Sequence, residues 1–223
     1  MGRNAHPEET VEKILDVAMR LFVEHGYDQT SMQDIIDGLG GLTKGAVYHH
    51  FKSKEELLSA GMARLMRPSL ERMRAIRDAV DYTGLQKLQM LLDEGGRGID
   101  TAFFGEAKPE LDPMVNPRML AMEYHEALEV SARDFVVPVI EQGVRDGSIA
   151  TRFPKELGEA VCLLLNTWCT PGFYPAVDAN EQRRRVAFMQ DLLHGMGADV
   201  QLDPSRDVET LERRRAFDGV VTC

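Results

Sequence analysis

The 223-residue chain contains few cysteines and no long apolar run, and both features restrict where it can work. No segment approaches the ~20 consecutive apolar residues that a membrane-spanning helix needs. Residues 1–10 are polar and form no apolar signal core, so we expect a cytoplasmic protein that does not associate with membranes. The three cysteines, Cys162, Cys169 and Cys223, show no metal-type spacing, and we expect them to be reduced thiols.

Sequence signatures of common enzymes are also missing. The chain has no phosphate-binding glycine loop after a strand pattern, no nucleophile elbow and no His/Cys metal spacing. Glu123 and His125 lie about 200° apart on a helix and cannot share a metal ion. Glu123 and Glu126 could share one, but two carboxylates alone make a poor transition-metal site. The sequence therefore predicts no enzyme, no cofactor and no metal centre.

The net charge of −10 argues at first against a nucleic-acid partner, but the charge is unevenly distributed. Residues 1–67 carry 8 Lys/Arg and 10 Asp/Glu, whereas residues 68–223 carry 18 and 26. A DNA-binding module needs only a local basic face, because particular side chains contact the phosphates. The composition, 43% apolar and 28% charged, is that of a folded globular protein.

Apolar residues recur at helical spacing and strand-like alternation is missing, so we predict an all-α fold. The first helix begins near Val11 and ends at Gly26. A short second helix begins after Ser31, which can cap it together with Asp34, and ends at Gly38.

Thr43 is a favourable N-cap for a third helix that extends to about His50. In this helix Val47 and Phe51 face inward, whereas Lys44, Gly45, Tyr48 and His49 face outward. The small residues Gly45 and Ala46 would allow a close approach to a ligand. Three short helices with glycines in the second connection indicate a helix-turn-helix, in which the third helix enters the DNA major groove.

Ser53 and Glu56 predict a capping box for a fourth helix, and Pro68 predicts a break or kink at the seam between module and body. The body is predicted to contain helices at about 84–94, 97–104, 117–145, 154–169 and 180–196. Residues 105–117 are predicted to form a loop, and a short helix is expected at about 208–216. We assign residues 1–52 to the DNA-binding domain, 53–200 to a regulatory and dimerisation domain with 53–67 as connector, and 201–223 to a tail.

The stretch from Ile14 to Leu58, ILDVAMRLFVEHGYDQTSMQDIIDGLGGLTKGAVYHHFKSKEELL, resembles the N-terminal module of the TetR/AcrR family of transcriptional regulators. The shared landmarks are the amphipathic first helix, Gly26-Tyr27, Thr30-Ser31-Met32, Asp34-Ile35, Thr43-Lys44-Gly45, Tyr48-His49-His50-Phe51 and Ser53-Lys54-Glu55. One departure is that the turn Gly38-Leu39-Gly40-Gly41-Leu42 is one residue longer than is common in the family.

The resemblance implies a homodimer whose two recognition helices enter successive major grooves of a roughly palindromic operator. It makes Lys44 and His49 candidates for contacts to base edges, beside Gly45 and Ala46. The candidates for phosphate contacts are Gln33, Thr43, Tyr48 and Lys54. His50 is expected to pack or to face solvent.

The helices at 154–169 and 180–196 are both amphipathic, and the resemblance implies that this pair dimerises as a four-helix interface. Finishing the core of the monomer is the alternative. Their apolar residues are Leu157, Val161, Leu164, Leu165 and Trp168, and Val186, Met189, Leu192, Leu193 and Met196. Arg183-Arg184-Arg185 is expected to be a solvated start to the last helix.

The methionine-rich body suggests a small apolar effector, and Tyr124 and Trp168 are the candidates for its pocket lining. We therefore predict a homodimeric repressor that a small molecule releases from its operator. A ligand-independent DNA-binding regulator and a ligand-dependent activator are the alternatives.

Overall fold

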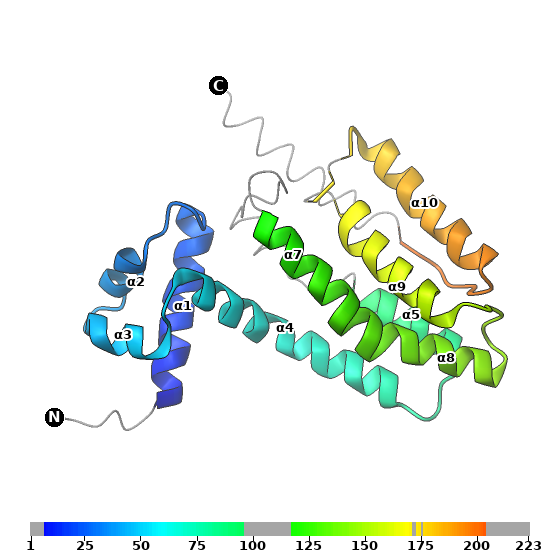
Figure 1. Ribbon diagram of the computed structural model, residues 1–223, viewed down its shortest axis with the longest axis horizontal. Coiled ribbons are helices and arrows are strands. Elements are labelled where there is room, and N and C mark those ends of the chain that lie inside the picture. The colour runs from blue at the N-terminus through cyan, green and yellow to red at the C-terminus, as the bar shows by residue number, and fades with distance from the viewer. Residues whose placement is uncertain (1–6, 96–116, 171–172, 175, 204–223) are drawn as a thin grey trace. The chain divides into compact units, whose positions relative to one another are not determined.

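The computed structural model describes residues 7–95, 117–170, 173–174 and 176–203 (Figure 1). These residues contain helices and no strand, which confirms the predicted all-α fold. None of these helices is long and apolar enough to cross a lipid bilayer. The predicted helix at 97–104, the loop before residue 117 and the tail helix lie outside the described residues. The described chain forms two compact units, residues 7–68 and residues 69–203.

The first unit contains α1 (Pro7–His25), α2 (Met32–Gly38), α3 (Lys44–His50) and the first part of α4 (Lys54–Asp78). Helix α1 begins four residues before the predicted Val11, with two glutamates in its first turn, where acidic side chains favour a helix N-terminus. One apolar core joins these helices; it comprises Ile14, Leu15, Ala18, Met19, Leu21, Phe22, Ile35, Ile36, Leu39, Val47, Phe51, Leu57 and Leu58.

Local capping interactions set the helix ends largely as predicted. Ser31 Oγ accepts from the Asp34 N–H, and the Asp34 carboxylate accepts from the Ser31 N–H, which completes the capping box of α2. Gly26 ends α1 with a φ of 84°. At α4, Ser53 Oγ accepts from the Glu56 N–H as predicted. The Glu56 carboxylate, however, accepts from the Lys52 N–H, whereas a capping box would require the N–H of Ser53, one residue later.

Helix α4 continues through Pro68, so of the two alternatives predicted there, a break or a kink, the break is wrong. Proline has no N–H, and the helix therefore lacks the hydrogen bond that residue 68 would donate to the Arg64 carbonyl. Packing on both sides of the proline offsets that loss. Before it, Met19 packs so closely on α4 that a Cβ at Gly61 would lie 2.2 Å from its sulfur. After it, Met73 is buried.

The second unit contains α5 (Gly84–Gly95) and the predicted helix at 117–145, which is one unbroken rod in Figure 1. That rod comprises α7 (Pro117–His125), the π-helical segment η1 (Glu126–Val136) and α8 (Val137–Asp146). The next helix comprises α9 (Pro154–Leu163) and the π-helical segment η2 (Leu164–Trp168), and α10 (Ala179–Gly195) follows. The core of the second unit is formed mainly by Leu88, Leu91, Phe135, Val139, Ile140, Leu157, Val161, Met189 and Leu193.

The start of α5 and the end of α8 approach each other at two glycines. A Cβ on Gly84 would lie 2.1 Å from the Gly143 nitrogen. The Asp146 carboxylate accepts from the Gly84 N–H, at 2.8 Å. Hydrogen bonds from Ser148 and from Gly84 lower the pKa of Asp146 to about 2. Gly147 then ends α8 in the left-handed region, at a φ of 80°.

Replacing Gly84 with alanine is expected to destabilise the protein, because the new Cβ would meet backbone atoms, which cannot rotate away. Overpacking costs about 1–3 kcal/mol, which for a protein of this size lowers the melting temperature by roughly 3–10 °C. Gly95→Ala on the same helix is the matched control, since no atom lies within 4 Å of its Cβ position. Equal melting temperatures for the two variants in a thermal melt would contradict the close contact.

Candidate nucleic-acid interface

Helix α3 is held by a cap at one end and by two buried side chains along one face. Thr43 is its N-cap, as predicted, and the Thr43 Oγ1 accepts from the Ala46 N–H at 3.2 Å. Val47 is fully buried and Phe51 is 8% exposed, so both face inward as predicted. These contacts fix which face of a seven-residue helix points to solvent.

The remaining surface of α3 carries the predicted DNA contacts. Lys44, Gly45 and His49 are exposed, whereas Ala46 and Tyr48 are half-buried. The Lys44 Nζ lies 5.8 Å from the centre of the Tyr48 ring. Within the described chain Lys44 makes no ion pair or hydrogen bond, so its ammonium group remains available to an anionic partner.

Lys52 fastens the end of α3, which the sequence analysis did not anticipate. Its Nζ donates to the Tyr48 carbonyl at 2.5 Å and reaches the His49 carbonyl at 3.5 Å. A lysine just after a helix often bonds its last carbonyls in this way, and that spacing was the available signal. The rings of His49 and His50 meet edge to face, with centroids 5.2 Å apart.

Two of the predicted phosphate contacts already have partners within the protein. The Gln33 Nε2 donates to Asp37 Oδ1 at 2.7 Å, on the exposed face of α2. The Lys54 Nζ donates to the carbonyls of Tyr27 and Thr30, at 2.8 Å and 3.2 Å. Their contacts to phosphate stay predictions.

The long turn between α2 and α3 uses glycine at two positions that other residues rarely adopt. Gly40 and Gly41 have φ angles of 55° and 129°. Between them and α2, Leu39 is 1% exposed and fixes the turn to the core of the first unit. The turn is therefore formed by glycine geometry around a buried leucine.

Comparison with known proteins places this geometry in a family. Residues 14–60 match the family described as bacterial regulatory proteins, tetR family. The chain is 30% identical over 178 residues to the HTH-type transcriptional repressor KstR2 of Rhodococcus jostii (strain RHA1), covering 74% of this chain and 82% of that protein. The chain belongs to the TetR family.

Solved structures of TetR-family regulators agree with the fold. A TetR/AcrR-family regulator from Thermobifida fusca is 26% identical, with a TM-score of 0.54, covering 84% of this chain and 98% of that one. A TetR-family regulator from Pectobacterium atrosepticum has a TM-score of 0.58 at 24% identity, covering 90% and 100%. The protein is thus a DNA-binding transcriptional regulator with the TetR helix-turn-helix, and it is not an enzyme.

In this TetR-family chain the two aromatic residues proposed for an effector pocket lie in different surroundings. Tyr124, on α7, is 56% exposed. Trp168 is half-buried at the end of η2 and meets the ring of Phe188 edge to face, with centroids 5.6 Å apart. Neither placement tests the proposed role in ligand binding.

Arg185 is not solvated, which corrects the expectation for the arginine run. It is 4% exposed, whereas Arg183 and Arg184 are exposed as predicted. The Arg185 guanidinium donates to the carbonyls of Trp168 and Tyr174, at 3.0 Å and 2.7 Å, and pairs with Glu181 at 2.8 Å. Carbonyls at the end of η2 and in the following loop need donors, and a buried arginine supplies several.

Glu123 and Glu126 are two half-buried acidic residues at the junction of α7 and η1. Burial, with a smaller contribution from the charge of Glu126, raises the pKa of Glu123 from 4.5 to about 7. Burial also raises the pKa of Glu126, whose Oε1 is buried without a hydrogen-bond partner in the described structure. No group of three or more His, Cys, Asp or Glu among the described residues could hold a metal ion.

The pKa of Glu123 predicts a stability that falls as the pH rises. The folded protein holds the proton of Glu123 up to about pH 7, whereas the unfolded chain releases it near pH 4.5. Ionisation therefore destabilises the fold increasingly between these values. Glu123→Gln should raise the melting temperature by several degrees at pH 8 and by little at pH 5, whereas the exposed control Glu71→Gln should change neither. An equal effect of Glu123→Gln at both pH values would contradict the shifted pKa.

Proposed function

We propose that the protein is a homodimeric repressor that binds a palindromic operator and is released from it by a small apolar effector. The exposed face of α3, with an unpaired Lys44 beside Tyr48, is the observation that carries the DNA-binding part of the proposal. Lys44 and His49 would contact base edges, and Thr43, Tyr48 and Gln33 would contact phosphates. Residues 1–52 would form the DNA-binding domain and residues 53–200 the regulatory and dimerisation domain. The repressor named among the relatives supports repression rather than activation.

Purified protein should enrich one or a few genomic fragments that share an inverted repeat, at moderate salt. Lys44→Ala combined with Tyr48→Phe should abolish the enrichment, because it removes the free ammonium and a hydroxyl from the exposed face of α3. Arg145→Ala, which removes an exposed positive charge on α8 outside the proposed interface, should leave it unchanged. The absence of enriched fragments with the wild-type protein at every salt concentration would overturn the repressor mechanism.

The dimer is proposed to form through the helices at 154–169 and 180–196. Half of their apolar residues serve the core of the protomer instead: Leu157, Val161, Val186, Met189 and Leu193 are at most 4% exposed. The apolar surface left for a partner is smaller. It consists of five half-buried residues and of Phe188, which is 53% exposed; the five are Leu164, Leu165, Trp168, Leu192 and Met196.

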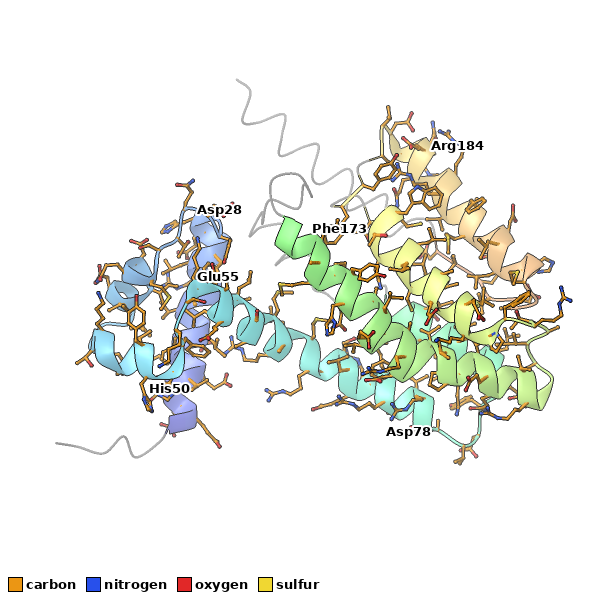
Figure 2. All side chains as sticks on the ribbon, viewed as in Figure 1. Asp28, His50, Glu55, Asp78, Phe173 and Arg184 are labelled. Carbon is orange, nitrogen blue, oxygen red and sulfur yellow. The ribbon has the colours of Figure 1, made fainter. Side chains whose placement is uncertain are left out.

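The exposed face of α10 carries a pattern of residues that can pair with a second copy of itself about a two-fold axis. Arg184, near the start of α10 in Figure 2, and Asp191 are exposed and lie one heptad apart on either side of Ala187 and Phe188. Antiparallel packing of two copies of α10 about this centre would bring Arg184 opposite Asp191 of the partner subunit, twice in each dimer. Phe188 would then pack over Ala187 of the partner subunit.

Charge reversal tests this arrangement. Arg184→Asp should weaken the dimer roughly tenfold, because two favourable pairs become two repulsive ones, and adding Asp191→Arg should restore the dimer. Arg145→Asp on α8 makes the same charge change on a surface outside the proposed interface. Sedimentation at low micromolar concentration measures the dimer affinity of the three variants. Equal affinities for the wild type, Arg184→Asp and the double variant would exclude this pairing.

The effector is proposed to bind the second unit, with Tyr124 and Trp168 as candidate contacts. A ligand can release DNA only if it binds the conformation with low operator affinity more tightly than the other. Thermal-shift screening against apolar compounds separates this function from the ligand-independent alternative, since bound ligand raises the melting temperature. A compound that raises operator affinity instead of lowering it would identify an activator.

A further inference from the structure

The ammonium group of Lys54 is enclosed by the connection between α1 and α2. Its Nζ donates to the carbonyls of Tyr27 at 2.8 Å, Thr30 at 3.2 Å and Asp28 at 3.4 Å. It also lies 4.2 Å from the centre of the Tyr27 ring. An ammonium group has three protons, and the three carbonyls account for all of them. In Figure 2, Asp28 is labelled in the connection and Glu55, the residue after Lys54, is labelled at the start of α4.

Contacts within the α1–α2 connection fix the positions of these carbonyls. Gly26 turns the chain at the end of α1, and the buried Thr30 donates its hydroxyl to the carbonyls of Leu21 and Gly26, at 3.2 Å and 2.8 Å. The Tyr27 ring packs on Phe22, with ring centroids 5.2 Å apart. Carbonyls in a short turn lack helical partners, so a cation that satisfies several of them joins the turn to the element that carries the cation.

The joined segments flank the DNA-binding helices on both sides. The connection leads directly to Ser31, the N-cap of α2, and Lys54 begins the helix that follows α3. The Lys54 hydrogen bonds thus join the α1–α2 connection to the start of α4. Helices α2 and α3 lie in the chain between these two joined segments. Loss of the ammonium group would free the start of α2 relative to the start of α4.

We propose that Lys54 is a positioning residue that sets the placement of α2 and α3 for operator binding, and that it does not contact phosphate. This proposal rests on the DNA-binding function proposed above. It replaces the phosphate role that the family resemblance implies, because a phosphate contact would require Lys54 to give up carbonyls it already satisfies. Lys44 on α3 differs, because its ammonium group has no hydrogen bond or ion pair within the described chain and can bind DNA without losing one.

Lys54→Met retains the aliphatic stem and removes the charge, so it separates the two roles. Operator affinity is measured against salt concentration at 10 °C, with the enriched fragment as probe. We expect the affinity to fall roughly tenfold to a hundredfold, the effect of one or two charge-assisted hydrogen bonds, with an unchanged salt slope. A phosphate contact would instead reduce the slope by about 0.9 for each lysine lost, as we expect for Lys44→Met if that residue contacts phosphate.

Three results would overturn the proposal. These are a reduced salt slope for Lys54→Met, a lower melting temperature with full operator affinity at 10 °C, and unchanged amide-exchange protection of residues 27–34. The exchange measurement uses the free protein and therefore stands even if no operator is found. Tyr27→Leu, which leaves the charge intact, should weaken binding in the same direction and add little to Lys54→Met.

Discussion

Helix α3 is seven residues long, and a helix of that length is not stable in water on its own. Its conformation therefore depends on burying Val47 and Phe51 against the core of the first unit. That single constraint determines the rest of the DNA-binding surface. Once Val47 faces inward, the helical period places His49 on the outside. Lys44, three residues before Val47, is exposed because it lies in the first turn of the helix, whose start the Thr43 cap fixes.

Helix α4 contributes residues to both units, and its packing explains why it tolerates a proline in its interior. In the first unit, α4 carries Gly61, where Met19 packs directly on the backbone. In the second unit, Ser69 and Arg72 donate to the buried carboxylate of Glu94, at 3.0 Å and 2.8 Å. The energy of these contacts is distributed along the helix, so the loss of one backbone hydrogen bond at the proline does not end it.

The second unit uses its apolar residues for two different purposes. On α10, Met189 and Leu193 complete the core of the protomer, whereas Phe188 on the neighbouring face is exposed. Apolar residues at helical spacing can serve either purpose, so the spacing alone did not separate core from surface. The buried Arg185 shows the same difficulty for charge, since its neighbours Arg183 and Arg184 face solvent.

The sequence by itself determined the features that depend on residues close together in the chain. The helices, the caps at Ser31 and Thr43 and the family motif involve contacts of about four residues or fewer, so their signals are local. The tertiary structure alone decided that α4 continues through Pro68, that Arg185 is buried and that Lys54 bonds carbonyls 24 to 27 residues away. These outcomes depend on which distant groups approach, and the free energy of burying or pairing a side chain is set by those neighbours rather than by its own position in the sequence.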